Sequence, residues 1–179
     1  MATMSRREAR KAVFELLFET EFNSERAPEE VLALAREDRD LGEDDFVEKT
    51  YLGATEKIAV IDVLLSKFSR GWKTDRMSRV SRAVLRLCTY EMLYTDVPAN
   101  VALNEAVELT KKFDDPKARA FVNGVLNSIK NEIEKTGAEP LVANCEAALA
   151  EAQAKEEAEV AVEEETSAET EATPTQENE

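Results

Sequence analysis

The sequence of 179 residues predicts an all-α fold, and three observations carry this prediction. Apolar residues recur at spacings of three and four over almost all of residues 1–137, which is the period of an amphipathic helix. No segment alternates apolar and polar residues as a half-buried strand does. Only five glycines and five prolines interrupt the chain, so long helices can form between them.

The first two helices have clear start signals. Ser5 and Glu8 have the spacing of a capping box, and the helix that they open is expected to reach about Phe22. Pro28 suits the first position of a second helix, because proline lacks the N–H that this position leaves unpaired. The second helix is expected to end within residues 39–42.

The middle of the chain contains one long helical pattern and one shorter helix. Apolar residues keep helical spacing over residues 44–68, and Gly53 within this run indicates either two helices or one bent helix. Ser78 is the expected N-cap of the next helix, which runs to about Tyr94. The Asp-Val-Pro sequence at residues 96–98 then breaks it.

Two further helices complete the domain. Apolar spacing over residues 102–113 predicts the first of them. Asp115 as N-cap and Pro116 at the first position open the second, and Gly137 is expected to end it. Gly124 lies inside this last helix, where we expect the absence of a side chain to permit close packing against a neighbouring helix.

The net charge of −15 is concentrated at the C-terminal end. Residues 1–137 hold 22 basic and 25 acidic side chains, whereas residues 138–179 hold one basic and thirteen acidic ones. Alanine-rich residues 140–153 allow a short helix, but the composition from Lys155 onward is typical of disorder. We therefore divide the chain into a folded domain, 1–137, and a mostly disordered acidic tail, 138–179. The tail either competes electrostatically with an anionic ligand or only aids solubility.

The composition excludes several function classes. The chain has no histidine, so it cannot form a Ser-His-Asp or Cys-His nucleophile system or a His-containing metal site. Cys88 and Cys145 are too few for a closed thiolate site and are typical of a reducing cytoplasm. No uncharged run exceeds ten residues, so no membrane span is expected. We expect no catalytic residue, no metal and no cofactor.

The first concentration of positive charge lies at the start of the first helix. Four cations occur there within six residues, and Phe14 and Phe18 follow on the same stripe. Cations at a helix N-terminus are unfavourable because this end carries partial positive charge, so a nearby anion such as a phosphate backbone is indicated. A solvated helix face is the alternative interpretation. The four cations are Arg6, Arg7, Arg10 and Lys11.

The second concentration lies within residues 70–86, where six cations accompany one acidic residue, Asp75, and Trp72 lies among them. Exposed arginines beside an aromatic ring suit single-stranded nucleic acid, because bases stack on rings and phosphates bind guanidinium groups. The alternative is that these arginines pair with acidic side chains and that Trp72 belongs to the core. The expected exposed stripe on the helix after Ser78 consists of Arg79, Arg82 and Arg86.

Five motifs follow one another between residue 5 and about residue 135. They are Arg-Arg-Glu-Ala-Arg at 6–10, Val-Ser-Arg-Ala-Val-Leu-Arg-Leu at 80–87 with Tyr-Glu at 90–91, Asp-Val-Pro at 96–98, Val-Ala-Leu-Asn-Glu-Ala-Val-Glu-Leu at 101–109 and Phe-Val-Asn-Gly-Val-Leu at 121–126. In order and spacing this set resembles the NusB family of bacterial transcription antitermination factors. The acidic tail lies outside the resemblance.

The resemblance implies two packed three-helix subdomains with about seven helices, and a binding protein rather than an enzyme. It also implies that the chain binds single-stranded boxA RNA of nascent ribosomal RNA leader transcripts together with the ribosomal protein NusE, within an RNA polymerase antitermination complex in the cytoplasm. A helical protein–protein adaptor without sequence-specific RNA binding is the alternative. The sequence leaves the monomer and the homodimer open.

The resemblance and the charge pattern together assign candidate site residues. The expected RNA-binding residues are Arg6, Arg7, Arg10, Lys11, Phe18, Trp72, Arg76, Arg79, Lys117, Arg119 and Asn123. The expected NusE-binding surface includes Asp75 and Ser81.

Overall fold

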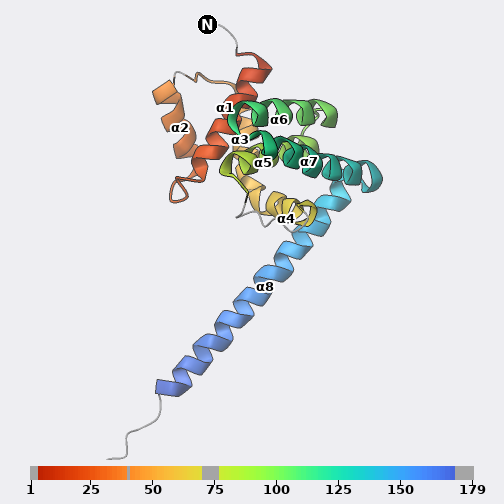
Figure 1. Ribbon diagram of the computed structural model, residues 1–179. Helices are drawn as coiled ribbons and strands as arrows, with labels where there is room; N and C mark the ends of the chain where they lie inside the picture. Colours follow the sequence, from red (N-terminus) through yellow and green to blue (C-terminus); the bar gives the residue numbers. More distant parts are fainter. Residues whose placement is uncertain (1–3, 40, 70–76, 172–179) are drawn as a thin grey trace, which may run out of the picture.

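A computed structural model describes residues 4–39, 41–69 and 77–171, with side chains as far as residue 158. All regular elements within these ranges are helices, so the predicted all-α fold is confirmed (Figure 1). The helices are α1 (Arg6–Thr20), α2 (Pro28–Arg39), α3 (Asp45–Glu56), α4 (Ile58–Phe68), α5 (Arg79–Tyr94), α6 (Ala99–Phe113), α7 (Pro116–Thr136) and α8 (Ala138–Glu171).

The expected caps hold the helix ends. The Ser5 hydroxyl accepts a hydrogen bond from the Glu8 backbone N–H, and the Glu8 carboxylate accepts one from the Ser5 N–H, which completes the capping box of α1. The Asp115 carboxylate accepts from the Lys117 N–H at the start of α7. Gly137 ends α7 with a positive φ of 86°, a conformation that glycine adopts without steric cost.

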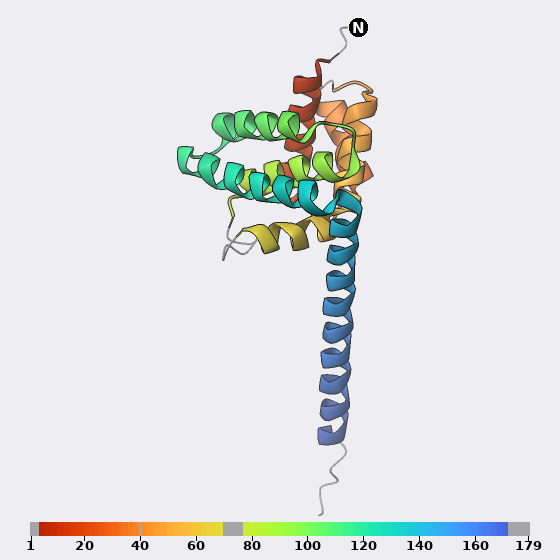
Figure 2. The same ribbon diagram turned by 90° about the vertical axis from the view of Figure 1, so that its right-hand side faces the viewer.

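Two groups of three helices pack against each other. Helices α1, α2 and α3 form one group through the contacts of α1 with α2 and α3, and α5, α6 and α7 form the other; the contacts of α5 with α1 and α3 join the groups. The two predicted subdomains are therefore confirmed. Helix α4 packs beneath α5 and α7 and also contacts α8 (Figure 2). The core between these helices is apolar, and its fully buried side chains include Leu16, Tyr51, Ile61, Leu85 and Leu126.

The close helix contact that the sequence placed at Gly124 occurs instead at Gly53. A Cβ atom built on Gly124 meets no atom within 4 Å, and this glycine is exposed on α7, so the prediction for Gly124 is wrong. A Cβ atom on Gly53 would lie 2.0 Å from the hydroxyl oxygen of Tyr90. Gly53 therefore makes room on α3 for a tyrosine of α5, and the helix break follows at Lys57.

The substitution Gly53→Ala is expected to lower the free energy of unfolding by about 1–3 kcal/mol, because the added methyl group displaces the Tyr90 ring. Gly124→Ala is the matched control. It should raise the free energy of unfolding by about 0.5–1 kcal/mol, because the helix propensity of alanine at an exposed position is higher than that of glycine. Urea denaturation measures both changes. A loss of stability in Gly124→Ala equal to that in Gly53→Ala would contradict this interpretation.

Helix α8 differs from the sequence-based expectation for the tail. It continues from residue 138 to Glu171, although disorder was expected from Lys155 onward. Leu141 and Cys145 in its first turns are buried in the core, so the folded body extends beyond the expected boundary at Gly137. Residues 150–158 are all exposed. Figures 1 and 2 both show the remainder of α8 directed away from the body.

Candidate nucleic-acid interface

Arg10, one of the expected RNA-binding cations, is part of the core. Its side chain is 5% exposed, and its Nε atom donates to both carboxylate oxygens of Glu91 at 3.0 Å. The Glu91 carboxyl is fully buried, and burial raises its pKa although Arg10 lowers it. The assignment of Arg10 to the RNA surface is therefore corrected. This arginine joins α1 to α5 through a buried ion pair.

The other three cations at the start of α1 remain accessible. Arg7 is 72% exposed and forms an ion pair of 2.9 Å with Glu105 of α6. The guanidinium of Arg6 lies over the Phe46 ring, 4.3 Å from its centroid. Lys11 is half-buried, and it pairs with Glu15 at 2.6 Å. Arg7 and Lys11 line a groove toward α6, whereas Arg6 lies against α3.

A groove of about 460 Å³ separates this part of α1 from α6. Five cations and three carboxylates line it, and one of the cations is Arg10, which is paired with the buried Glu91. Two of the cations, Lys111 and Lys112, lie at the end of α6 and were not among the expected site residues. Two consecutive lysines in the last turn of a helix were the available signal. Glu105, the carboxylate in the middle of the groove, is bonded to Arg7 and lies 3.7 Å from Arg10.

A row of aromatic rings continues from this groove along α1. The Phe14 ring lies 5.0 Å from Phe113 and 6.4 Å from Phe18, and Phe18 lies 5.2 Å from Phe22. Phe14 is buried, whereas Phe18 and Phe113 are half-buried. Phe22 is 56% exposed, and the sequence analysis missed it as a site residue. Its spacing of four from Phe18 was the signal that could have found it.

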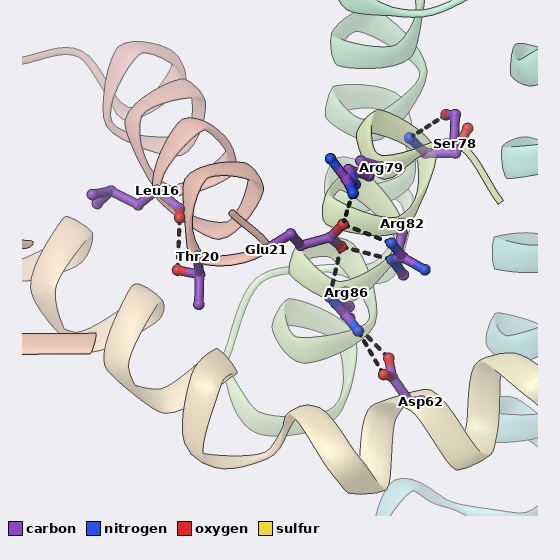
Figure 3. Close-up of polar contacts among 9 residues, drawn as sticks. Leu16, Thr20, Glu21, Asp62, Ser78, Arg79, Arg82 and Arg86 are labelled. Atoms are coloured by element: carbon purple, nitrogen blue, oxygen red, sulfur yellow. Dashed lines mark hydrogen bonds and ion pairs between the residues drawn. The ribbon is translucent and has the colours of Figure 1, made fainter. Parts of the chain in front are cut away.

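The expected arginine stripe on α5 is largely neutralised by a carboxylate at the end of α1 (Figure 3). Arg82 donates to both oxygens of Glu21 at 2.7 Å, and Arg86 donates to Glu21 at 2.8 Å and to both oxygens of Asp62. The side chains of Arg82 and Arg86 are mostly buried. The prediction that they form an exposed stripe is therefore wrong, and the alternative of pairing with acidic residues is confirmed for them.

Arg79 is the one arginine of that expected stripe that stays exposed. Its side chain is 51% exposed, and its Nε atom lies 3.9 Å from Glu21, at the limit of an ion pair. Its guanidinium lies over the ring of Phe22, 4.2 Å from the centroid. Arg79 therefore lies beside the aromatic row with its guanidinium half exposed.

A shared carboxylate connects the start of α5 to the end of α6, just before α7 begins. The hydroxyls of Ser78 and Ser81 each donate to the same oxygen of Asp114 at 2.6 Å. Burial raises the pKa of Asp114, but these hydrogen bonds outweigh it and hold the pKa below the usual 3.8. Ser81 is buried, so its assignment to the NusE-binding surface is corrected.

The expected site residues of α7 lie just beyond this connection. Lys117 and Arg119 are accessible, and Asn123 is half-buried with its side-chain oxygen accepting from Asn127 at 3.1 Å. Trp72, Asp75 and Arg76, the remaining expected residues, lie outside the described residues.

The accessible cations and rings described above, linked through the buried Phe14, form a group that we call the basic-aromatic strip. It extends from the groove between α1 and α6, along the row of rings, to the first residue of α5. Of the expected site residues it contains Arg7, Lys11, Phe18 and Arg79. The full strip consists of Arg7, Lys11, Phe18, Phe22, Arg79, Lys111, Lys112 and Phe113.

Two kinds of feature are absent from the described residues. Among them no helix has both the length and the apolar character needed to cross a membrane. The same part of the chain contains no cluster of three or more His, Cys, Asp or Glu side chains suited to a metal ion.

Comparison with known proteins gives a consistent result. The NusB family matches residues 7–131. Transcription antitermination protein NusB of Bacillus velezensis is 44% identical over 132 residues, which cover 73% of this chain and 99% of that protein. The Bacillus subtilis protein of the same name is 42% identical over 134 residues, covering 74% and 100%. Helix α8 lies beyond the family match.

Solved structures agree with the sequence comparison. The structure of T. maritima NusB has a TM-score of 0.67 and 34% identity, covering 73% of this chain and 94% of that one. A structure of antitermination factors NusB and NusE in complex with dsRNA has a TM-score of 0.64 and 28% identity, covering 71% and 96%.

Proposed function

The chain belongs to the NusB family, and from this premise we propose that it is a transcription antitermination factor that binds boxA RNA of nascent ribosomal RNA leader transcripts together with NusE. The complex of NusB and NusE with dsRNA among the structural relatives supports NusE and an RNA as partners. A factor that acts on nascent bacterial transcripts works in the cytoplasm, which is the compartment we propose.

The observation that carries the RNA-binding part of this proposal is the basic-aromatic strip. Its five cations can bind phosphates, and its half-exposed and exposed rings can stack on bases. Stacking on a side chain requires an unpaired base, because a paired base is already stacked within its helix. The strip therefore favours single-stranded RNA as the ligand.

We propose a binding role without catalysis. Glu105 and Glu108 are the carboxylates that α6 contributes to the groove, three residues apart. Glu105 is paired with Arg7 at 2.9 Å and lies 3.7 Å from Arg10, which is a contact that joins α1 to α6. The exposed lysines of the groove, Lys111 and Lys112, suit an anion such as a phosphate.

The test is the affinity of the full chain for single-stranded boxA RNA, for a scrambled RNA of equal length and for a boxA duplex, each with and without NusE. We expect the single-stranded boxA RNA to bind most tightly. The variant with Arg7→Ala and Lys112→Ala should weaken this binding. It should also flatten the slope of log K against log salt by about 0.7 for each phosphate that is no longer neutralised.

Lys49→Ala is the matched control, because Lys49 is an exposed lysine of α3 outside the strip and pairs with Asp45 on its own helix. Its affinity and salt slope should equal those of the parent chain. Equal binding of all three RNAs, together with tight binding to NusE, would support the protein–protein adaptor instead.

A further inference from the structure

Phe22 stands out on the surface because it is large, apolar and exposed, and yet held in one place. It follows the end of α1, where its backbone N–H donates to the Glu19 carbonyl at 2.9 Å. Its ring meets the Phe18 ring edge-on at 5.2 Å, with an angle of 63° between the planes. More than half of its surface remains in contact with solvent. Such a ring is available to a ligand with little loss of conformational freedom.

Arg79 holds the same ring from α5. Its guanidinium lies 4.2 Å from the centroid of Phe22, which is a favourable cation–π geometry. The guanidinium is itself half exposed, so it can contact an anion without leaving the ring. The pair therefore offers an apolar face and a positive charge side by side.

Glu21 fixes the position of this pair. It directly precedes Phe22, and its carboxylate bonds Arg82 and Arg86 of α5 while lying 3.9 Å from Arg79 (Figure 3). The buried side chains of Arg82 and Arg86 make the short contacts to Glu21, at 2.7 and 2.8 Å, whereas Arg79 lies 3.9 Å from it and is half exposed. The guanidinium of Arg79 is therefore the one that a ligand can reach from solvent.

We propose that Phe22 and Arg79 form a nucleobase-binding site for one unpaired RNA nucleotide, with the base stacked on Phe22 and a phosphate at Arg79, and that Glu21 is the positioning residue of this site. The proposal rests on the RNA-binding function proposed above. It adds a specific stacking site at the end of the basic-aromatic strip.

Charge and continuity favour RNA as the occupant. A purely apolar partner would leave the exposed guanidinium of Arg79 without a counter-charge, whereas a nucleotide presents both a planar ring and a phosphate. The site also continues the row of rings that begins at the groove between α1 and α6. A strand bound along the cations of the strip would therefore bring one of its bases to Phe22.

The test combines variants of Phe22 with boxA RNAs that each lack a single base. Phe22→Ala should weaken binding of the intact single-stranded RNA by about 5- to 150-fold, which corresponds to the loss of one stacked base. Phe22→Ala should cost almost no affinity for the one RNA that lacks the stacked base, because the base that the Phe22 ring would contact is already missing from that RNA. The separate variant Phe22→Tyr should bind the intact RNA as tightly as the parent chain, since tyrosine keeps the ring.

Two variants of the ion cluster test the positioning role. The coupling is the ratio between the affinity loss that Phe22→Ala causes with the intact RNA and the loss it causes with the RNA that lacks the stacked base. In a chain that carries Glu21→Gln this ratio should fall toward one, because Arg79 and Phe22 are no longer held together. Asp62→Asn removes the same charge from the cluster, but Asp62 pairs with Arg86 and not with Arg79, so the coupling should persist. Circular dichroism and urea denaturation establish that each variant is folded at the temperature of the binding measurement.

The outcomes separate the stacking site from the proposed function. If Phe22→Ala binds intact boxA RNA as tightly as the parent chain, or loses the same factor with every RNA in the set, the stacking site is wrong while RNA binding stands. If Phe22→Ala impairs only NusE binding, the ring belongs to a protein interface and the stacking site is again wrong. If the parent chain does not bind boxA RNA, with or without NusE, both proposals fail.

Discussion

Replacing Arg10 by methionine is expected to lower the free energy of unfolding by about 3–5 kcal/mol at pH 7.5, because it leaves the buried carboxylate of Glu91 without its partner. Methionine fills most of the space of the aliphatic arginine stem, so the effect reports the lost charge and not a cavity. Urea denaturation of the variant and the parent chain, followed by circular dichroism, measures the change.

The pH dependence of this variant identifies the cause. Burial already raises the pKa of Glu91 above 4.5, and without Arg10 the pKa rises further. A carboxyl whose pKa is higher in the folded than in the unfolded state binds protons more tightly in the folded state. The free energy of unfolding therefore increases as the pH falls from the folded pKa toward the unfolded pKa. The deficit of Arg10→Met should therefore shrink between pH 7.5 and pH 5.

Two further variants serve as controls for the loss of stability in Arg10→Met. The double variant with Arg10→Met and Glu91→Leu should recover most of the lost stability, because no charge remains buried. Arg7→Met removes an exposed guanidinium and should leave the free energy of unfolding nearly unchanged while weakening RNA binding. An Arg10→Met variant of full stability with weakened RNA binding would return Arg10 to the RNA surface.

The sequence predicted the helix boundaries well because the signals for them are local. Ser5 and Glu8 lie within one helical turn, as do Asp115 and Lys117, so the hydrogen bonds that cap α1 and α7 need no distant partner. Gly137 acts through its own backbone conformation. Such signals can be recognised in the chain before anything is known of its packing.

The fate of each cation could not be predicted, because it depends on partners far away in the sequence. Arg7 and Arg10 are three residues apart with the same chemistry, but only Arg10 faces Glu91, 81 residues later. Similarly, Arg82 is neutralised by a carboxylate 61 residues before it. A helix period alone shows which side chains share a face and does not show what that face meets.

Glycine shows the same limit for packing. Gly53 and Gly124 both lie inside helices, and the sequence pattern indicated a break or bend at Gly53 and close packing at Gly124. The difference is that Tyr90 of α5 approaches Gly53, whereas the side of α7 at Gly124 faces solvent. Close contact is a property of two elements, so the pattern on one of them is insufficient.

A chain that ends at Gly137 is expected to lose at least about 2–5 kcal/mol of unfolding free energy, which is the cost of deleting a single buried leucine from a core. This truncation removes Leu141 and Cys145, which are buried, and uncovers the side of α4 against which α8 packs. A chain that ends at Gln153 keeps these contacts and should be as stable as the full chain. Thermal unfolding of the three chains measures the difference.

The chain ending at Gln153 also tests whether the acidic segment competes with RNA. Residues 154–171 continue α8 over about 27 Å at 1.5 Å per residue, away from the basic-aromatic strip. A rigid segment on that side cannot reach the strip, so both chains should bind boxA RNA with equal affinity at low and at high salt. Tighter binding by the shortened chain at low salt, with a difference that disappears as salt rises, would contradict this expectation. It would mean that α8 unfolds and that its acidic side chains contact the strip.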